Sequence, residues 1–155
     1  MEVTVEYMIL IPVLILQIFL FPMFVNVVMT QYVNDQKSLA LQEAASYLSS
    51  SIEQVYLSLN HTSIVSTTLT NNLGPQPLID GYAYTGNATL QTGSNSSPVL
   101  DVTLRLVGTN ISTSTLVTLG QNVKWVKSTF TSDSSSVCII AEKFPDQVIQ
   151  LSFGT

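Results

Sequence analysis

The chain has 155 residues, of which 46% are hydrophobic and only 10% are charged, and its formal net charge is -5. Its five Lys and Arg residues are too few to form the basic patch that nucleic-acid binding needs, so we expect no nucleic-acid partner. The one histidine, His61, lies in an Asn-X-Thr motif at an expected helix end, which argues against a His-based triad or a multi-His metal site. We expect neither enzymatic activity nor a cofactor or bound metal.

The segment from Glu2 to Thr30 is the most unusual part of the chain. No charged residue occurs between Tyr7 and Thr30, and nearly every side chain there is large and apolar. As a helix, this run would extend roughly 35 Å, enough to cross the ~30 Å hydrocarbon core of a bilayer. A helix that is apolar on every face must lie in lipid or be buried by other helices. Pro12 and Pro22 interrupt the run and predict kinks, but the apolar pattern continues through both, so we expect bends rather than termination.

Glu6 lies where the apolar run begins. An ionised carboxylate in an apolar medium costs several kcal/mol unless it is paired or neutralised. Pairing with the amino terminus of a neighbouring subunit would fix the axial register of an assembly. Alternatively, Glu6 stays solvated at the headgroup level, near the positive end of the helix dipole.

No basic residue precedes Lys37, and the run is longer than a cleavable signal's apolar region, so we expect a basic leader in a precursor.

The sequence EVTVEYMIL at residues 2–10, followed by Pro22 within the apolar run, resembles the mature start of a type IV pilin, and archaeal type IV pilins most closely. The resemblance covers residues 1–30. It implies that a prepilin peptidase removes the leader, that a membrane platform and an assembly ATPase act on the subunit, and that the apolar helices bundle into a filament core. It also assigns the register glutamate of the family to Glu6. That assignment holds if the mature chain begins at Glu2, which leaves Met1 as either a precursor residue or the true first residue.

From Gln31 to Leu59, apolar residues recur at three- and four-residue steps and so predict one buried stripe on a continuing helix. The stripe consists of Val33, Leu41, Ala45, Leu48, Ile52, Val55, Tyr56 and Leu59. We therefore expect residues 1–60 to form one long helix. Its residues 1–30 would enter a membrane or a filament core, and its amphipathic residues 31–60 would pack on a globular domain.

Beyond the helix, short β-type runs separated by turn residues predict a β-sandwich head domain over residues 61–155. The expected strands cover residues 63–69, 79–84, 89–92, 100–107, 114–119, 123–130, 137–143 and 147–153. Alternation of Val102, Leu104 and Leu106 with polar residues predicts a strand with one wet face. Cys138 stands beside two isoleucines, so we expect it to be an inert core residue. The fold class is α+β, with a kinked N-terminal helix and an antiparallel sandwich for which an immunoglobulin-like arrangement is one candidate.

Four Asn-X-Ser/Thr motifs occur in this region, and each is expected at a helix end or in a loop, where a glycan acceptor is accessible. The candidate N-glycosylation sites are Asn60, Asn87, Asn95 and Asn110. In a chain so rich in Ser, Thr and Asn, such motifs also arise by chance. We expect at least one of them to be glycosylated if the domain is extracellular.

Together these features predict a structural subunit, the major pilin of an extracellular type IV pilus-like filament that serves surface adhesion or cell–cell contact. The subunit would be held in the inner (cytoplasmic) membrane and then assembled into a helical homo-oligomer, whose exposed heads would carry glycans and meet host or surface receptors. One alternative is a membrane-anchored extracytoplasmic β-sandwich, similar to an archaellum stator component or a minor pseudopilin, that does not polymerise in bulk. Another is a secreted carbohydrate-binding or hydrolytic domain on a membrane tether.

Overall fold

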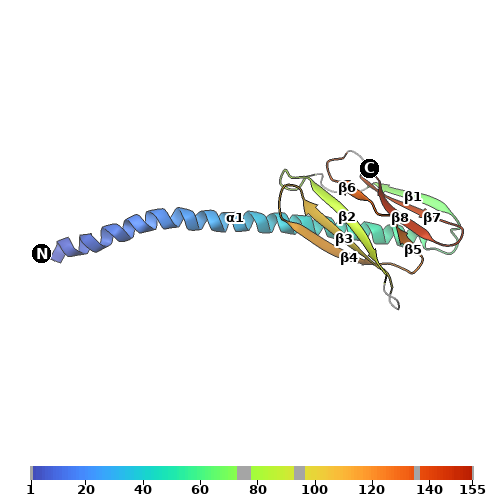
Figure 1. Ribbon diagram of the computed structural model, residues 1–155, viewed down its shortest axis with the longest axis horizontal. Coiled ribbons are helices and arrows are strands. Elements are labelled where there is room, and N and C mark those ends of the chain that lie inside the picture. Colours follow the sequence, from blue (N-terminus) through green and yellow to red (C-terminus); the bar gives the residue numbers. More distant parts are fainter. Residues whose placement is uncertain (1, 73–77, 93–96, 135–136, 155) are drawn as a thin grey trace. The chain divides into compact units, whose positions relative to one another are not determined.

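The chain folds as one long helix, α1 (Glu2–Leu59), followed by two four-stranded β-sheets, which is an α+β arrangement (Figure 1). The computed structural model describes residues 2–72, 78–92, 97–134 and 137–154, with side chains from Tyr7 onward. The chain divides into two compact units, Met1–Gln36 and Lys37–Thr155. The boundary between the units lies inside α1 rather than at its end.

Within the first unit, α1 runs without a break through both of its prolines, Pro12 and Pro22 (Figure 1). The expectation that neither proline terminates the helix is therefore confirmed. Near the end of the apolar run, the Thr30 hydroxyl donates a hydrogen bond to the Asn26 carbonyl at 2.8 Å. This bond satisfies a polar side chain within the helix itself, so Thr30 needs no partner elsewhere.

Within the second unit, the rest of α1 contributes one face to the hydrophobic core. The predicted stripe is confirmed from its second residue onward, since these side chains are at most 7% exposed: Leu41, Ala45, Leu48, Ile52, Val55, Tyr56 and Leu59. Val33, the first residue of the predicted stripe, is 37% exposed and does not belong to this core. The helix ends at Leu59, where the Asn60 amide still donates to the Tyr56 carbonyl at 2.9 Å.

The first sheet has the strand order β1-β7-β8-β5. Its strands are β1 (Thr67–Asn72), β7 (Cys138–Lys143), β8 (Ile149–Gly154) and β5 (Val123–Trp125). The second sheet has the order β4-β3-β2-β6. Its strands are β4 (Ser112–Thr118), β3 (Val99–Leu106), β2 (Tyr84–Gln91) and β6 (Thr129–Thr131). All neighbours pair antiparallel except β5 and β8, which are parallel, so the sheets depart from a purely antiparallel sandwich.

Both sheets and the second half of α1 share a single core (Figure 1). The alternation predicted for residues 100–107 is confirmed in β3, where Val102, Leu104 and Leu106 are fully buried while Thr103 and Arg105 are exposed. β7 and β8 alternate in the same way, with every second residue buried. A ladder of edge-to-face aromatic pairs adds Tyr84, Phe130, Phe153 and Trp125 to this core.

Two of the predicted strands differ from the structure in the residues that they cover. Residues 79–84 and 89–92 were expected to be separate strands, but a tight turn occupies the first range and β2 covers Tyr84–Gln91 as one strand. In that turn Asp80 and Gly81 both have positive φ angles, of 50° and 80°, which is the geometry of a type I′ hairpin. An Asp-Gly pair suits this turn, so the local signal was present in the sequence.

The expected strand over residues 123–130 is in fact two short strands that belong to different sheets, β5 and β6. The chain crosses between the sheets over residues 126–128, where the Ser128 hydroxyl donates to the Val126 carbonyl and accepts from the Phe153 amide. Cys138 also differs from expectation: it is half-buried at the start of β7 rather than a core residue. Alternation along β7 places the neighbouring Ile139 inside instead.

Candidate assembly surface

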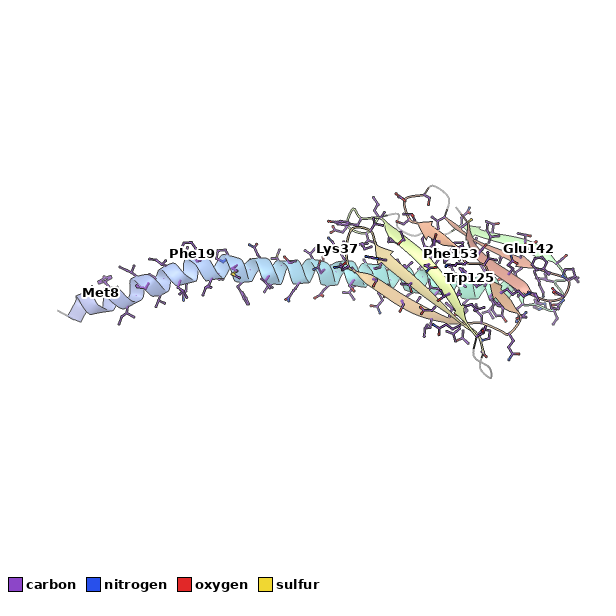
Figure 2. The ribbon with its side chains drawn as sticks, in the orientation of Figure 1. Met8, Phe19, Lys37, Trp125, Glu142 and Phe153 are labelled. Atoms are coloured by element: carbon purple, nitrogen blue, oxygen red, sulfur yellow. The ribbon has the colours of Figure 1, made fainter. Side chains whose placement is uncertain are left out.

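The described part of the first unit, Tyr7 to Gln36, exposes its side chains along its whole length. Large apolar groups project from every side of this segment, as Figure 2 shows around the labelled Met8 and Phe19, which are 79% and 75% exposed. The 18-residue window that is most apolar in this part of α1 has no buried residue. By length and composition, this helix is able to cross a membrane.

Polar groups within this segment are few. Gln17 is one of them, and it lies in a shallow groove on one helix face with Leu14, Ile18, Leu20, Phe21 and Phe24. A neutral amide surrounded by apolar side chains is stabilised when a partner supplies a hydrogen bond. The Glu6 side chain, predicted to set axial register, lies outside the described side chains.

The second unit holds its end of α1 through a lysine at the unit boundary. Lys37 Nζ lies 3.3 Å from the Asp80 carboxylate and 4.3 Å from the centre of the Tyr82 ring. Both partners come from the type I′ turn, whose Ile79 and Tyr82 exchange backbone hydrogen bonds of 2.9 Å. The turn thereby gives the first residue of the unit an ion pair and a cation–π contact.

At the other end of the buried helix, Lys143 on β7 supplies a second attachment. Its side chain is only 2% exposed, and its ammonium donates to the carbonyl of His61 at 2.9 Å. His61 lies two residues beyond the end of α1, and its carbonyl also accepts from the Ile64 amide at 3.1 Å, so the lysine and this turn together satisfy it. Nearby, the Asn122 amide donates to the Asn60 side chain at 3.1 Å and to the Gln147 carbonyl at 3.0 Å.

The attachments made by Lys37 and Lys143 were not predicted from the sequence. The signal for Lys143 was its place two residues after Ala141 on the core-facing side of a strand. The partners of Lys37 are 43 and 45 residues away and could not be read from local spacing.

The candidate glycosylation sites do not share one environment. Asn60 follows α1 and is exposed, but its side-chain oxygen already accepts the bond from Asn122. Asn110 is exposed in the turn between β3 and β4. Asn87 is exposed but lies in the middle of β2, opposite Thr103 of β3, so its expected place in a loop is wrong. Asn95 lies outside the described residues.

Within the described ranges, the titratable side chains form no group of three or more that would suit a metal ion. His61 is exposed, and its ring nitrogen Nδ1 lies 2.7 Å from the Ser63 hydroxyl. Burial raises the pKa of Tyr84 above its usual 10.0, because the neutral phenol is favoured in the core. Its hydroxyl has no hydrogen-bond partner among the described residues.

No protein-family model, no curated protein and no solved structure matches this chain.

Proposed function

We propose that this chain is a structural subunit of an extracellular filament of the type IV pilus kind. The observation that supports the proposal is the contrast within one helix. Residues from Leu41 to Leu59 bury an apolar stripe in their own domain, whereas residues from Tyr7 to Thr30 expose apolar side chains on every face. In water, burying each such Leu, Ile or Phe side chain is worth about 1.5–3 kcal/mol, so this segment requires a shared apolar environment.

The segment would lie in the cytoplasmic membrane before assembly and among copies of itself afterwards. Transfer from lipid to a helix bundle gains little hydrophobic free energy, since lipid tails are as apolar as leucine. Close packing and polar contacts must then determine the assembled arrangement. We assign that role to Gln17 within this segment and to Glu6 directly before it. The second unit would form the outer surface of the filament, with glycans on its accessible sequons, and the function is structural rather than enzymatic.

A second candidate is a membrane-anchored protein with the same β-sheet head that does not polymerise. It is favoured by the same property, since α1 is long and apolar enough to span a bilayer once. In that case the exposed segment needs only lipid around it, and the Glu6 carboxylate has no axial register to set.

Glu6→Ala separates the two candidates, with Glu2→Ala as the matched control. For a filament subunit we expect Glu6→Ala to abolish filaments in electron micrographs of sheared cell-surface material, while the protein still fractionates with membranes. Glu2→Ala should keep filaments. Normal filaments from Glu6→Ala would overturn the role of this carboxylate, and an absence of filaments from the unaltered chain would favour the anchor.

A further inference from the structure

The four edge strands of the two sheets differ in how they are protected. In the first sheet the edges are β1 and β5, and in the second they are β4 and β6. β5 and β6 have three residues each, β5 carries Lys124, and each lies beside a strand of the opposite sheet. Short length, lysine and coverage are the usual means by which proteins prevent edge-to-edge pairing.

Among the described residues, the other two edges have none of these protections. β1 has six residues, TTLTNN, and β4 has seven, STSTLVT, without a charge, a proline or a glycine. None of the chain's acidic or basic residues lies in either strand. Among the described residues β1 pairs only with β7, and β4 only with β3. Five of the six β1 residues are exposed, so this strand is joined to the domain mainly through its backbone.

The hydrogen bonds of β4 show which of its backbone groups face outward. Leu119 donates to the Pro98 carbonyl at 3.0 Å, and Leu106 donates to the Ile111 carbonyl at 3.0 Å. Antiparallel ladders alternate, so the odd-numbered residues of β4 bond to β3 and the even-numbered residues point away from it. Ser112, Ser114 and Leu116 therefore present N–H and C=O groups to the open edge.

We infer that β4 of one copy pairs with β1 of the next copy and extends the sheet between neighbouring head domains. A second copy fits this edge because both strands are uncharged and nearly equal in length, so pairing buries no charge and leaves little backbone unpaired. The two edges belong to different sheets of one domain, so the contact joins unlike surfaces and can continue head-to-tail through many copies. This inference rests on the proposed filament function and specifies one of its contacts.

The test uses filaments of the full chain with Cys138→Ser, so that introduced cysteines are the only thiols. Thr70→Cys in β1 and Ser114→Cys in β4 place one thiol near the middle of each edge, and residues that are directly opposite or diagonal on paired strands lie within about 8 Å. A short bis-maleimide should give a ladder of covalent dimers, trimers and higher multimers when both cysteines are in one chain. Each single variant should give none, and Thr129→Cys on the short edge β6 is the matched replacement for Ser114→Cys.

Ser114→Pro is the second test, because it removes one outward N–H and no internal ladder bond. It should abolish or shorten filaments while leaving the thermal midpoint of the detergent-solubilised subunit within a few degrees of the parent's. Thr129→Pro, whose N–H also points away from its neighbour β2, should keep filaments.

Four outcomes overturn the inference. They are dimers from Ser114→Cys alone, a cross-link to a chain of different mass, normal filaments from Ser114→Pro, and intact filaments that give no ladder with both thiols. Loss of filaments from the parent chain instead overturns the proposed function, and this inference falls with it.

Discussion

Two leucines on α1, one buried and one exposed, form a matched pair for testing whether the two halves of the helix have different roles. Leu48 is 3% exposed in the shared core, whereas Leu20 is 54% exposed in the apolar segment. Truncating a buried leucine to alanine removes its transfer free energy and leaves a cavity, which together cost about 2–5 kcal/mol. Leu48→Ala should therefore lower the free energy of unfolding of the second unit by that amount, which is a large share of the ~5–15 kcal/mol of a typical domain. Leu20→Ala should change it by less than about 0.5 kcal/mol.

The assay is urea unfolding of the full-length subunit in detergent, followed by the fluorescence of Trp125. This is the chain's one tryptophan, and its ring packs edge-to-face on Phe153 with 4.9 Å between centroids (Figure 2). We expect the opposite order of effects on assembly. Leu20→Ala should weaken filaments more than its small effect on the unfolding free energy of the subunit explains. Equal losses of unfolding free energy from Leu20→Ala and Leu48→Ala would refute the division of α1 into a buried and an exposed half.

Three further substitutions test the core of the second unit. Gly86→Ala should destabilise it by about 1–3 kcal/mol, because the added methyl group would overlap the ring of Phe130; unchanged urea unfolding would contradict this packing. Lys143→Met keeps the stem but removes one of the two donors to the His61 carbonyl, which still accepts from the Ile64 amide, so we expect a loss of about 0.5–1.5 kcal/mol. An increase in stability would show that the free energy of burying the cation exceeds that of the bond. Tyr84→Phe should be neutral or stabilising by up to about 1 kcal/mol at pH 7, because it removes a buried hydroxyl without a partner. The pKa of this phenol is raised in the folded state, so the parent's free energy of unfolding is unaffected by the ionisation of Tyr84 below pH 10.0 and falls as the pH rises further, where the buried phenol resists ionisation. Tyr84→Phe should therefore lose less stability than the parent in alkaline urea titrations.

Periodicity in the sequence was sufficient for the elements that bury one face. The stripe from Leu41 to Leu59 and the alternation in β3 both follow from side-chain spacing, and both are present in the structure. The helix end at Leu59 was likewise expected near Asn60. Spacing is informative here because each element places one face in a common core.

Contacts between distant residues were not predictable in the same way. The crossing between β5 and β6 interrupts a run of β-type residues that contains no glycine or proline, so nothing local marks it. The mid-strand position of Asn87 depends on β2 continuing through Gly86, a residue that usually indicates a turn or a bulge. Gly86 is accommodated there because the ring of Phe130 occupies the space beside it.

The candidate site was predictable only in its apolar part. The exposed segment from Tyr7 to Thr30 follows directly from a run without charges. The two lysines that attach α1 to its domain required the fold, because the bonds of Lys37 and Lys143 span 43 and 82 residues of sequence. The unprotected edges β1 and β4 also required the strand order, since an edge is defined by which neighbours are absent.

The most direct test of the central claim is to shear the surface of cells that express the chain, image the material by electron microscopy, and identify its subunit by mass spectrometry. We expect helical filaments composed of this chain, with the segment from Tyr7 to Thr30 protected from protease in their core. Recovery of the chain only as a monomer in membrane extracts, with no filaments in the sheared fraction, would contradict it.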